Sequence, residues 1–204
     1  MSLHKFSLAS AAVIVLIWLG LVPVSAASMT VQEAMSERVL GKADAPVTII
    51  EFASLTCPHC KDFEINVLPK LKTAYIDTGK VKFVYRDFPL DGRALLAAMV
   101  ARCAPKDRYF AFLDALFRSQ ESWARAQDPV QALGQVARVG GMSQADFDAC
   151  IKNQALFEAI KKDALEAQSQ YKIESTPTFI INGKKMDGTH TFESFEAALK
   201  PLLK

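Results

Sequence analysis

Two cysteines lie two residues apart in the motif Cys57-Pro58-His59-Cys60, and this spacing supports more than one kind of chemistry. The pair can exchange between a dithiol and a disulfide, form a plain crosslink, or supply half of a metal site. A four-ligand metal site needs two more ligands, but His190 is the only other histidine after residue 27, and no second Cys-x-x-Cys exists. We therefore favour redox chemistry and expect no metal ion and no cofactor.

The elements predicted around the motif favour a reactive thiolate at Cys57. Residues 46–52 form a β-branched and aromatic run that predicts a buried strand, and a helix is expected to begin at the motif. Free backbone N–H groups and the positive end of the helix dipole then point at the Cys57 sulfur. His59 can add a positive charge or a hydrogen bond, although the helix terminus alone could have the same effect. We expect Cys60 to attack the mixed disulfide that forms at Cys57.

The motif is followed by a helix and a second strand. Apolar residues at helical spacing from Phe63 to Tyr75 predict a helix, and Pro69 inside it should produce a kink. Residues 81–88 alternate between apolar and polar side chains, as a strand does. Strand, helix and strand in this order predict a right-handed parallel βαβ unit.

The rest of the chain divides into a helical part and a final ββα unit. Residues 92–171 lack strand-like runs, and breaks such as Asp128-Pro129 predict four or five helices there. Strands are expected at 178–181 and 184–186 around an Asn-Gly turn, followed by a helix capped by Thr191. The prediction is an α/β fold, βαβ plus ββα, formed by residues 27–91 and 172–204, with residues 92–171 as an inserted all-helical subdomain.

The N-terminus has the pattern of a secretory signal peptide. Lys5 precedes an apolar run over residues 11–22, and small residues follow at 24–26. The run is about a dozen residues, shorter than the ~20 that span a bilayer, so we predict cleavage of residues 1–26, after Ala26 or Ala27. An uncleaved membrane anchor is the alternative. Cleavage would lower the formal net charge from +2 to +1, because Lys5 is the only full charge removed.

Export would place the four cysteines in an oxidising compartment. Cys57 and Cys60 are too close in the chain for a disulfide between them to stabilise a long loop. This leaves Cys103 and Cys150 as the other pair. We expect a structural disulfide between them; two free thiols or a second redox pair are the alternatives. The 24 basic and 22 acidic residues nearly cancel and form no basic cluster interleaved with aromatics, so nucleic acid is excluded as a partner.

Two segments carry a resemblance to a known family. Residues 51–60, Glu-Phe-Ala-Ser-Leu-Thr-Cys-Pro-His-Cys, resemble the active-site segment of the DsbA family of thiol:disulfide oxidoreductases. Residues 175–179, Ser-Thr-Pro-Thr-Phe, resemble the family's loop before its third strand. The resemblance covers residues 37–204 and implies a thioredoxin fold with a helical insertion. It also implies a cis bond before Pro177, contact of Thr176 with the sulfurs, and pairing of a substrate peptide with this backbone edge.

The resemblance also implies a role for Glu51 and marks one departure. The matching acid of the family lies beneath the active site and assists proton movement at the second cysteine; the alternative is a strand-end carboxylate whose head reaches water. The family's best-known form lacks a second cysteine pair, so Cys103 and Cys150 indicate a variant subgroup and leave the redox poise open.

The function implied by the resemblance is a periplasmic enzyme that introduces disulfides into unfolded or reduced exported polypeptides. A DsbB-like membrane quinone reductase would reoxidise it. A disulfide isomerase or reductase would use the same residues, but isomerases of this fold usually carry a dimerisation region, for which residues 27–46 leave no room. We therefore expect a monomer. A non-catalytic peptide- or metal-binding module of the same fold is a further alternative.

Overall fold

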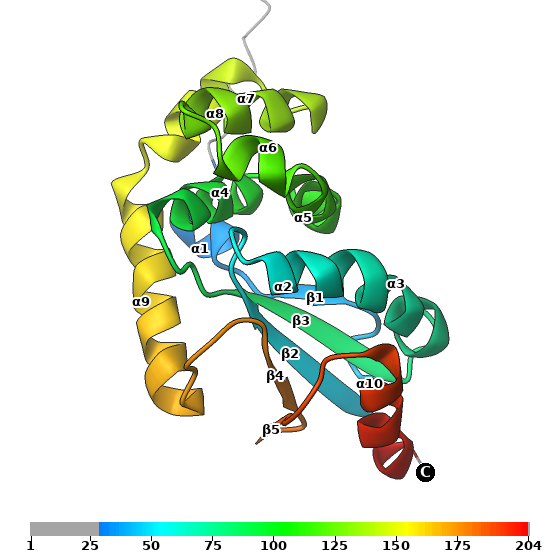
Figure 1. The fold of residues 1–204 in the computed structure, drawn as a ribbon. Helices are drawn as coiled ribbons and strands as arrows, with labels where there is room; N and C mark the ends of the chain where they lie inside the picture. The colour runs from blue at the N-terminus through cyan, green and yellow to red at the C-terminus, as the bar shows by residue number, and fades with distance from the viewer. Residues whose placement is uncertain (1–28, 204) are drawn as a thin grey trace, which may run out of the picture.

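A five-stranded mixed sheet organises the computed structural model, which describes residues 29–203 (Figure 1). The strands are β1 (Arg38–Leu40), β2 (Val47–Ala53), β3 (Val81–Asp87), β4 (Thr178–Ile181) and β5 (Lys184–Lys185). They lie in the order β1-β3-β2-β4-β5. β2 and β3 are parallel, and every other neighbouring pair is antiparallel. The four strands predicted from the sequence are confirmed, each within one residue at either end.

Ten α-helices are found within residues 29–203. They are α1 (Val31–Ala34), α2 (Pro58–Asp62), α3 (Leu68–Leu71), α4 (Gly92–Arg102), α5 (Tyr109–Arg118), α6 (Gln120–Ala124), α7 (Pro129–Val139), α8 (Gln144–Ile151), α9 (Gln154–Tyr171) and α10 (Phe192–Leu199). Six of them, α4 to α9, occupy the segment for which four or five were predicted. That prediction was wrong because only Ser119 separates α5 from α6, and neither proline nor glycine marks the boundary.

The helix that follows the cysteine motif is interrupted, as Pro69 predicted. A π-helical turn over Phe63–Val67 separates α2 from α3, and a second one over Lys72–Ile76 follows α3. Proline has no backbone N–H to continue the regular helical pattern, and the first irregular turn ends just before it. Phe63, Leu71 and Tyr75 remain buried, so the apolar stripe still faces the sheet.

The two faces of the sheet are covered by different helices. On one face the ring of Phe63, after α2, lies 4.5 Å from that of Phe179 on β4 and 6.2 Å from that of Phe83 on β3. On the other face Phe52 of β2 lies 5.2 Å from Tyr171 at the end of α9. Figure 1 shows this arrangement, with α2 and α3 crossing one side of the sheet and α9 along the other.

Local signals in the sequence gave correct element boundaries. Ser143 and Thr191 cap α8 and α10 through their hydroxyl oxygens, and Pro129 begins α7. Asn182 and Gly183 both have positive φ, which is the turn that the Asn-Gly pair predicted between β4 and β5. Helix α1 and strand β1 were not predicted, although Thr30 and Glu33 form a capping box around the start of α1.

One apolar core runs from the sheet into the helices of residues 92–171. It includes Phe83 of β3, Phe63 after α2, Leu113 of α5 and Leu133 of α7. The two predicted parts, a thioredoxin-like domain and a helical subdomain, therefore pack on one shared apolar core. Their division into separate domains stays a prediction.

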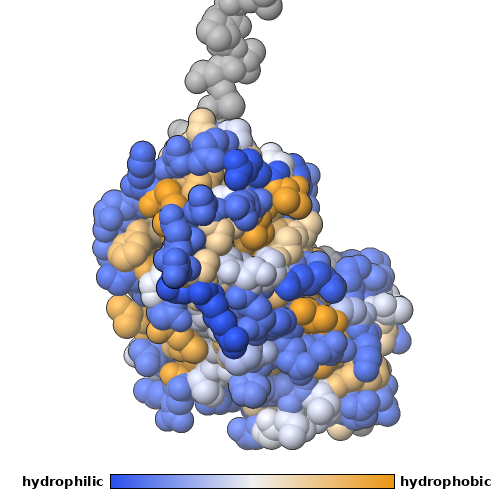
Figure 2. Space-filling model, turned by 45° about the horizontal axis from the view of Figure 1, so that its top comes forward, coloured by the Kyte–Doolittle hydropathy of each residue, from blue (hydrophilic) through white to orange (hydrophobic). Residues whose placement is uncertain are grey.

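Polar side chains cover most of the face shown in Figure 2, and apolar ones appear there as separate patches. The large hydrophobic residues that are more than a third exposed come from distant parts of the chain; they are Leu90, Val130, Val139, Leu165 and Leu202. Within residues 29–203, no helix combines the length and apolar character that crossing a membrane requires. The predicted signal peptide lies outside the described residues.

Candidate active site

Cys57 sits at the junction that the sequence predicted. It follows β2 after a short loop and is the N-cap residue of α2, with extended backbone angles and with Pro58 in the first helical turn. Its backbone N–H donates to the carbonyl of Ser54, which closes the loop. Both motif cysteines are in the dithiol form, and both are buried, with Cys57 7% exposed and Cys60 0%.

The surroundings of Cys57 stabilise its thiolate. The Cys60 thiol donates a hydrogen bond to the Cys57 sulfur, and the hydroxyl of Thr176 and the backbone N–H groups of Cys60 and His59 also donate to it. Together these donors outweigh the cost of burial and lower the pKa of Cys57 from about 9 to about 5. At neutral pH the sulfur of Cys57 is therefore a thiolate.

Cys60 has the opposite electrostatic environment. Burial raises the pKa of its thiol well above the ordinary value, and its hydrogen bond to Cys57 and the charges of Glu51 and Cys57 raise that pKa further. A thiol that stays protonated beside a stable thiolate gives the pair two distinct roles. Cys57 can leave as a thiolate, whereas Cys60 needs a proton acceptor before it can attack.

Thr176 and Pro177 lie against Cys57, as the family resemblance implied. The Thr176-Pro177 bond is cis, and the Cys57 Sγ lies 3.3 Å from the carbonyl oxygen of Thr176, to which it donates when it is a protonated thiol. Thr176 is 8% exposed, and its Oγ1 is buried. The loop before β4 and the motif after β2 thus meet at one sulfur, although they are 119 positions apart.

Glu51 is fully buried on β2, so its head does not reach water. Burial raises the pKa of its carboxyl well above the usual range, and the neighbouring Glu64 and Cys57 raise it further. Glu64, in the turn that follows α2, is 7% exposed, and burial raises its pKa to about 7. Sequence reasoning missed Glu64, although its position four residues after Cys60 places it on the same buried side of the helix.

Gln120 is a second residue that sequence reasoning missed. It is 3% exposed on α6, and its Nε2 donates to the carbonyl oxygens of Leu55 at 2.7 Å and Cys57 at 3.0 Å. The helical segment therefore holds the loop that carries the nucleophile. No sequence signal distinguishes this glutamine from the surface glutamines around it.

Pro58 and His59 are exposed at the start of α2. The contribution of His59 that the structure shows is the backbone N–H aimed at the Cys57 sulfur. A role for its imidazole ring stays a prediction. Within residues 29–203, no three His, Cys, Asp or Glu side chains lie together in a group that could hold a metal ion.

The second cysteine pair is bonded. Cys103, the C-cap of α4, and Cys150, on α8, form a disulfide with Cα atoms 6.1 Å apart. Neither Cys103 nor Cys150 is among the groups that shift the pKa of Cys57 or Cys60. This disulfide joins two helices of the segment 92–171.

Comparison with known proteins agrees with this fold. A family model described as "Thioredoxin" matches residues 33–201. The crystal structure of Wolbachia pipientis alpha-DsbA1 is 35% identical, has a TM-score of 0.76, and aligns over 83% of this chain and 92% of that one. BdbD from Bacillus subtilis, in its oxidised form, is 26% identical with a TM-score of 0.72, over 82% and 92% of the two chains. The chain therefore belongs to the thioredoxin family and, within it, to the DsbA-like proteins.

Sequence relatives extend the comparison. Disulfide bond formation protein D of Bacillus subtilis is 29% identical over 178 residues, which cover 81% of this chain and 77% of the relative. Relatives from Rickettsia bellii and Rickettsia felis are 27% and 28% identical. The chain spans 63% and 60% of the length of these two relatives, so they contain further sequence outside the match.

Proposed function

We propose that the chain is a protein-disulfide oxidoreductase that introduces disulfides into reduced, exported polypeptides through Cys57 and Cys60. The observation that carries the proposal is the contrast between the two sulfurs. Cys57 has a pKa of about 5, while the pKa of Cys60 is raised well above its ordinary value. A stabilised thiolate favours the dithiol form of the protein, and the corresponding disulfide is then a strong oxidant.

The transfer proceeds through a mixed disulfide. A substrate thiolate attacks the Cys57 sulfur of the Cys57–Cys60 disulfide, a new bond forms between substrate and Cys57, and Cys60 leaves with the electron pair of the broken bond. A second thiolate of the substrate then attacks the substrate sulfur, and Cys57 leaves as a thiolate. The substrate has lost two electrons and gained a disulfide. The same two electrons have reduced the protein to its dithiol form. The backbone beside Thr176 is the proposed contact for the substrate peptide.

The dithiol must be oxidised again before a second turnover. A DsbB-like membrane quinone reductase is the proposed partner, and the periplasm is the proposed location, reached through the signal peptide at residues 1–26. The names of the relatives, disulfide bond formation protein D and alpha-DsbA1, support a role in disulfide formation. A monomer is proposed for the active form.

The experiment is the oxidation of a reduced peptide that carries two cysteines. Stoichiometric oxidised protein should convert the peptide to its disulfide within one turnover, and Cys57→Ser should abolish the transfer, as followed by acid quenching and mass spectrometry. Cys60→Ser should retain a single reactive thiolate and trap mixed disulfides. Thr73→Val, on the exposed side of the helix, serves as a matched control that leaves the transfer unchanged.

The reduction potential separates the oxidase from its rivals. Equilibration with glutathione should give a value well above the roughly −270 mV of thioredoxin. A value near thioredoxin's would favour the reductase, and efficient reshuffling of scrambled disulfides without net oxidation would favour the isomerase. Peptide binding that persists in Cys57→Ser, with no transfer by the unmodified protein, would favour a binding module.

A further inference from the structure

A pocket of about 210 Å³ lies beside the nucleophile, between the loop that carries it and helices α4 and α6. Its lining residues are Thr56, Pro58, Asp91, Arg93, Gln120, Glu121, Ala124 and Arg125. Thr56 and Pro58 flank Cys57 in the chain, so the pocket begins one residue from the reactive sulfur. In the sheet β2 lies between β3 and β4; the loop before β4 brings Thr176 to Cys57, and the loop after β3 leads to the pocket. Thr176 and the pocket therefore lie on different sides of Cys57.

Hydrogen bonds between different elements hold the walls of this pocket in place. The hydroxyl of Thr56 donates to Oδ2 of Asp91, the N-cap of α4, at 2.6 Å. Gln120 of α6 donates to the carbonyl oxygens on either side of Thr56. Arg93 of α4 donates from Nη1 to the carbonyl oxygen of Ala124, at the end of α6. Because the walls are tied together in this way, the pocket is preformed, and binding in it costs little ordering of the protein.

The two acids that line the pocket already have partners. Both carboxylate oxygens of Asp91 accept hydrogen bonds, one from Thr56 and one from the backbone in the first turn of α4. Glu121 lies 3.1 Å from Arg125 and 3.7 Å from Lys61. Neither acid is therefore free to bind a positively charged ligand, and the charge of Arg125 is compensated within the protein.

Arg93 is the cation of the pocket that has no carboxylate partner. Its side chain is half-buried, and the bond to Ala124 occupies one of the five N–H donors of a guanidinium group. Among residues 29–203 it forms no ion pair and no second hydrogen bond. A guanidinium group that is anchored at one corner presents its other donors in a fixed plane, which matches the two oxygens of a carboxylate.

We propose that this pocket binds the carboxylate of a glutamate or aspartate that neighbours the reacting cysteine of the substrate polypeptide, with Arg93 as its partner. The substrate backbone would lie beside Thr176, its sulfur would react at Cys57, and the adjacent acidic side chain would enter the pocket. An extended chain advances about 3.3 Å per residue, so a residue next to the cysteine reaches a pocket that begins one residue from Cys57. The inference rests on the proposed function and names a class of substrate sequence that it prefers.

The selectivity of the transfer step among otherwise identical peptides tests the proposal. Reduced peptides with two cysteines carry glutamate, glutamine or lysine directly before the first cysteine, and a second series carries them directly after it. Second-order rate constants with the oxidised protein are divided by the thiolate fraction of each peptide, because a neighbouring charge also shifts the pKa of the peptide thiol. In at least one series the glutamate peptide should react about threefold or more faster than the lysine peptide at low salt, and added salt should reduce this ratio.

Variants of Arg93 show whether the preference comes from the pocket. Arg93→Gln should bring the ratio of the glutamate and lysine rate constants close to one, whereas Arg93→Lys keeps the charge and should retain part of the ratio. Arg138→Gln, at an exposed position on α7 outside the pocket, is the matched control and should keep the full ratio. Comparing ratios between proteins cancels the intrinsic reactivity of each peptide. An unchanged ratio in Arg93→Gln overturns the proposal; so does a ratio of one or less in both series with the unmodified protein, which needs no variant.

A second measurement does not need turnover. Cys60→Ser is linked through Cys57 to single-cysteine versions of the same peptides, and exchange of each mixed disulfide with glutathione is brought to equilibrium. The glutamate peptide should be retained about threefold or more over the lysine peptide. Adding Arg93→Gln to Cys60→Ser should remove this difference.

The outcomes separate this inference from the proposed function. If the unmodified protein oxidises the peptides but the selectivity does not depend on Arg93, the pocket does not select carboxylates, and the inference is wrong while the function stands. If no peptide is oxidised, the proposed function fails, and the exchange equilibrium alone decides about the pocket. A difference that depends on Arg93 then supports the pocket, and equal equilibrium constants reject it.

Discussion

The side chain of Gln120 donates a hydrogen bond of 3.0 Å to the carbonyl oxygen of Cys57, although 63 residues separate the two in the chain. A second bond of 2.7 Å from the same Nε2 reaches the carbonyl of Leu55. Both acceptors belong to the loop that places the nucleophile at the start of α2. The helical segment thus fixes the backbone of the active site as well as covering it.

Replacement of Gln120 should destabilise this loop. Gln120→Met keeps the approximate shape of the side chain but leaves the buried carbonyl of Leu55 without a donor, while the carbonyl of Cys57 keeps only its bond from the Lys61 backbone N–H. The loss should cost about 1–3 kcal/mol of unfolding free energy. Urea denaturation measures the loss, and amide hydrogen exchange should increase at residues 54–60. Gln154→Met, at an exposed position on α9, should change the unfolding free energy by no more than about 0.5 kcal/mol. Equal effects of the two substitutions would contradict the role of Gln120 in holding this loop.

The hydroxyl of Thr176 contributes to the low pKa of Cys57. Thr176→Val removes this side-chain contribution while the backbone carbonyl next to Cys57 stays in place, so the pKa of Cys57 should rise above about 5. The rate of alkylation of the reduced protein against pH reports the thiolate fraction directly. Thr176→Ser retains the hydroxyl and should keep a midpoint close to that of the unmodified protein. A Val variant with an unchanged midpoint would assign the shift to the helix terminus and Cys60 alone.

Stability of the reduced protein should depend on pH through Cys57. Because its folded pKa of about 5 lies below the ordinary thiol value of about 9, ionisation favours the folded state most above pH 9. This contribution declines as pH falls and is lost near pH 5, where the folded protein also binds the proton. The difference in unfolding free energy between the reduced protein and Cys57→Ser should therefore shrink from pH 8 to pH 5. A constant difference would mean that the thiolate is not stabilised by folding.

Much of the fold was predictable because its signals are local. The cap of α10 at Thr191, the Asn182-Gly183 turn and the interruption near Pro69 each follow from one or two residues and their backbone preferences. Strand β1 was missed because Arg38–Leu40 is only three residues long, and its existence depends on pairing with β3. A strand of that length has no periodicity to detect.

The candidate site also combines residues that the sequence marks locally with residues that only the packing brings in. Cys57 and Cys60 were evident from their spacing, and Thr176 and Pro177 followed from the family resemblance. Gln120 and Glu64 were not predicted, because what makes them part of the site is burial next to the motif. Glutamine and glutamate are ordinary residues on exposed helices, so their types alone indicate nothing. Only the packing of α6 and of the turn after α2 brings them under the cysteines.

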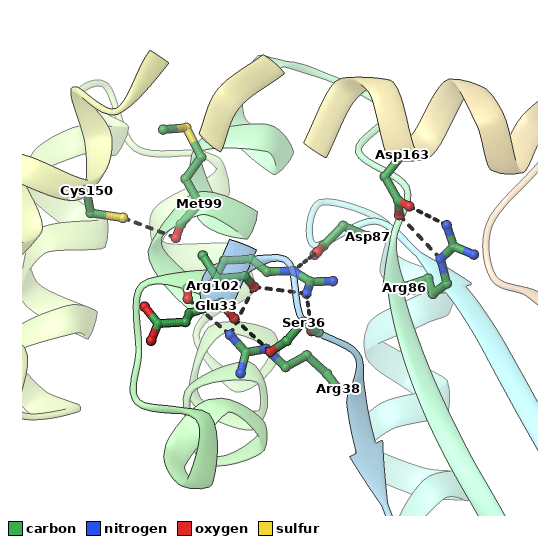
Figure 3. Close-up of polar contacts among 10 residues, drawn as sticks. Glu33, Ser36, Arg38, Arg86, Asp87, Met99, Arg102, Cys150 and Asp163 are labelled. Atoms are coloured by element: carbon green, nitrogen blue, oxygen red, sulfur yellow. Dashed lines mark hydrogen bonds and ion pairs between the residues drawn. The ribbon is translucent and has the colours of Figure 1, made fainter. Parts of the chain in front are cut away.

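A buried ion pair near the active-site end of β3 should contribute strongly to stability. Arg102 of α4 donates from Nε to Asp87 at 2.6 Å, and both side chains are 4% exposed (Figure 3). Arg102 also donates to the carbonyl oxygens of Ala34 and Ser36, next to β1. The pair therefore joins the end of the sheet, the helical segment and the N-terminal residues.

Loss of the Asp87 charge should leave Arg102 buried without compensation. Asp87→Asn should lower the unfolding free energy by about 3–5 kcal/mol, as measured by urea denaturation. Glu166→Gln, which breaks the exposed pair with Lys162, should cost no more than about 1 kcal/mol. A similar small loss for Asp87→Asn would show that water or another group compensates the Arg102 charge.

The Cys103–Cys150 disulfide should act on stability more than on redox chemistry. It links residues 47 positions apart on α4 and α8, and the loop-entropy model predicts a stabilisation of about 4 kcal/mol for a loop of that length. The double replacement Cys103→Ser with Cys150→Ser should therefore lower the urea midpoint clearly. The pKa of Cys57 should stay near 5, because no donor to its sulfur comes from either half-cystine. Alkylation against pH and urea denaturation on the same variant measure both quantities. An unchanged urea midpoint would refute the structural role, and a shifted Cys57 pKa would show that the second disulfide also tunes the first.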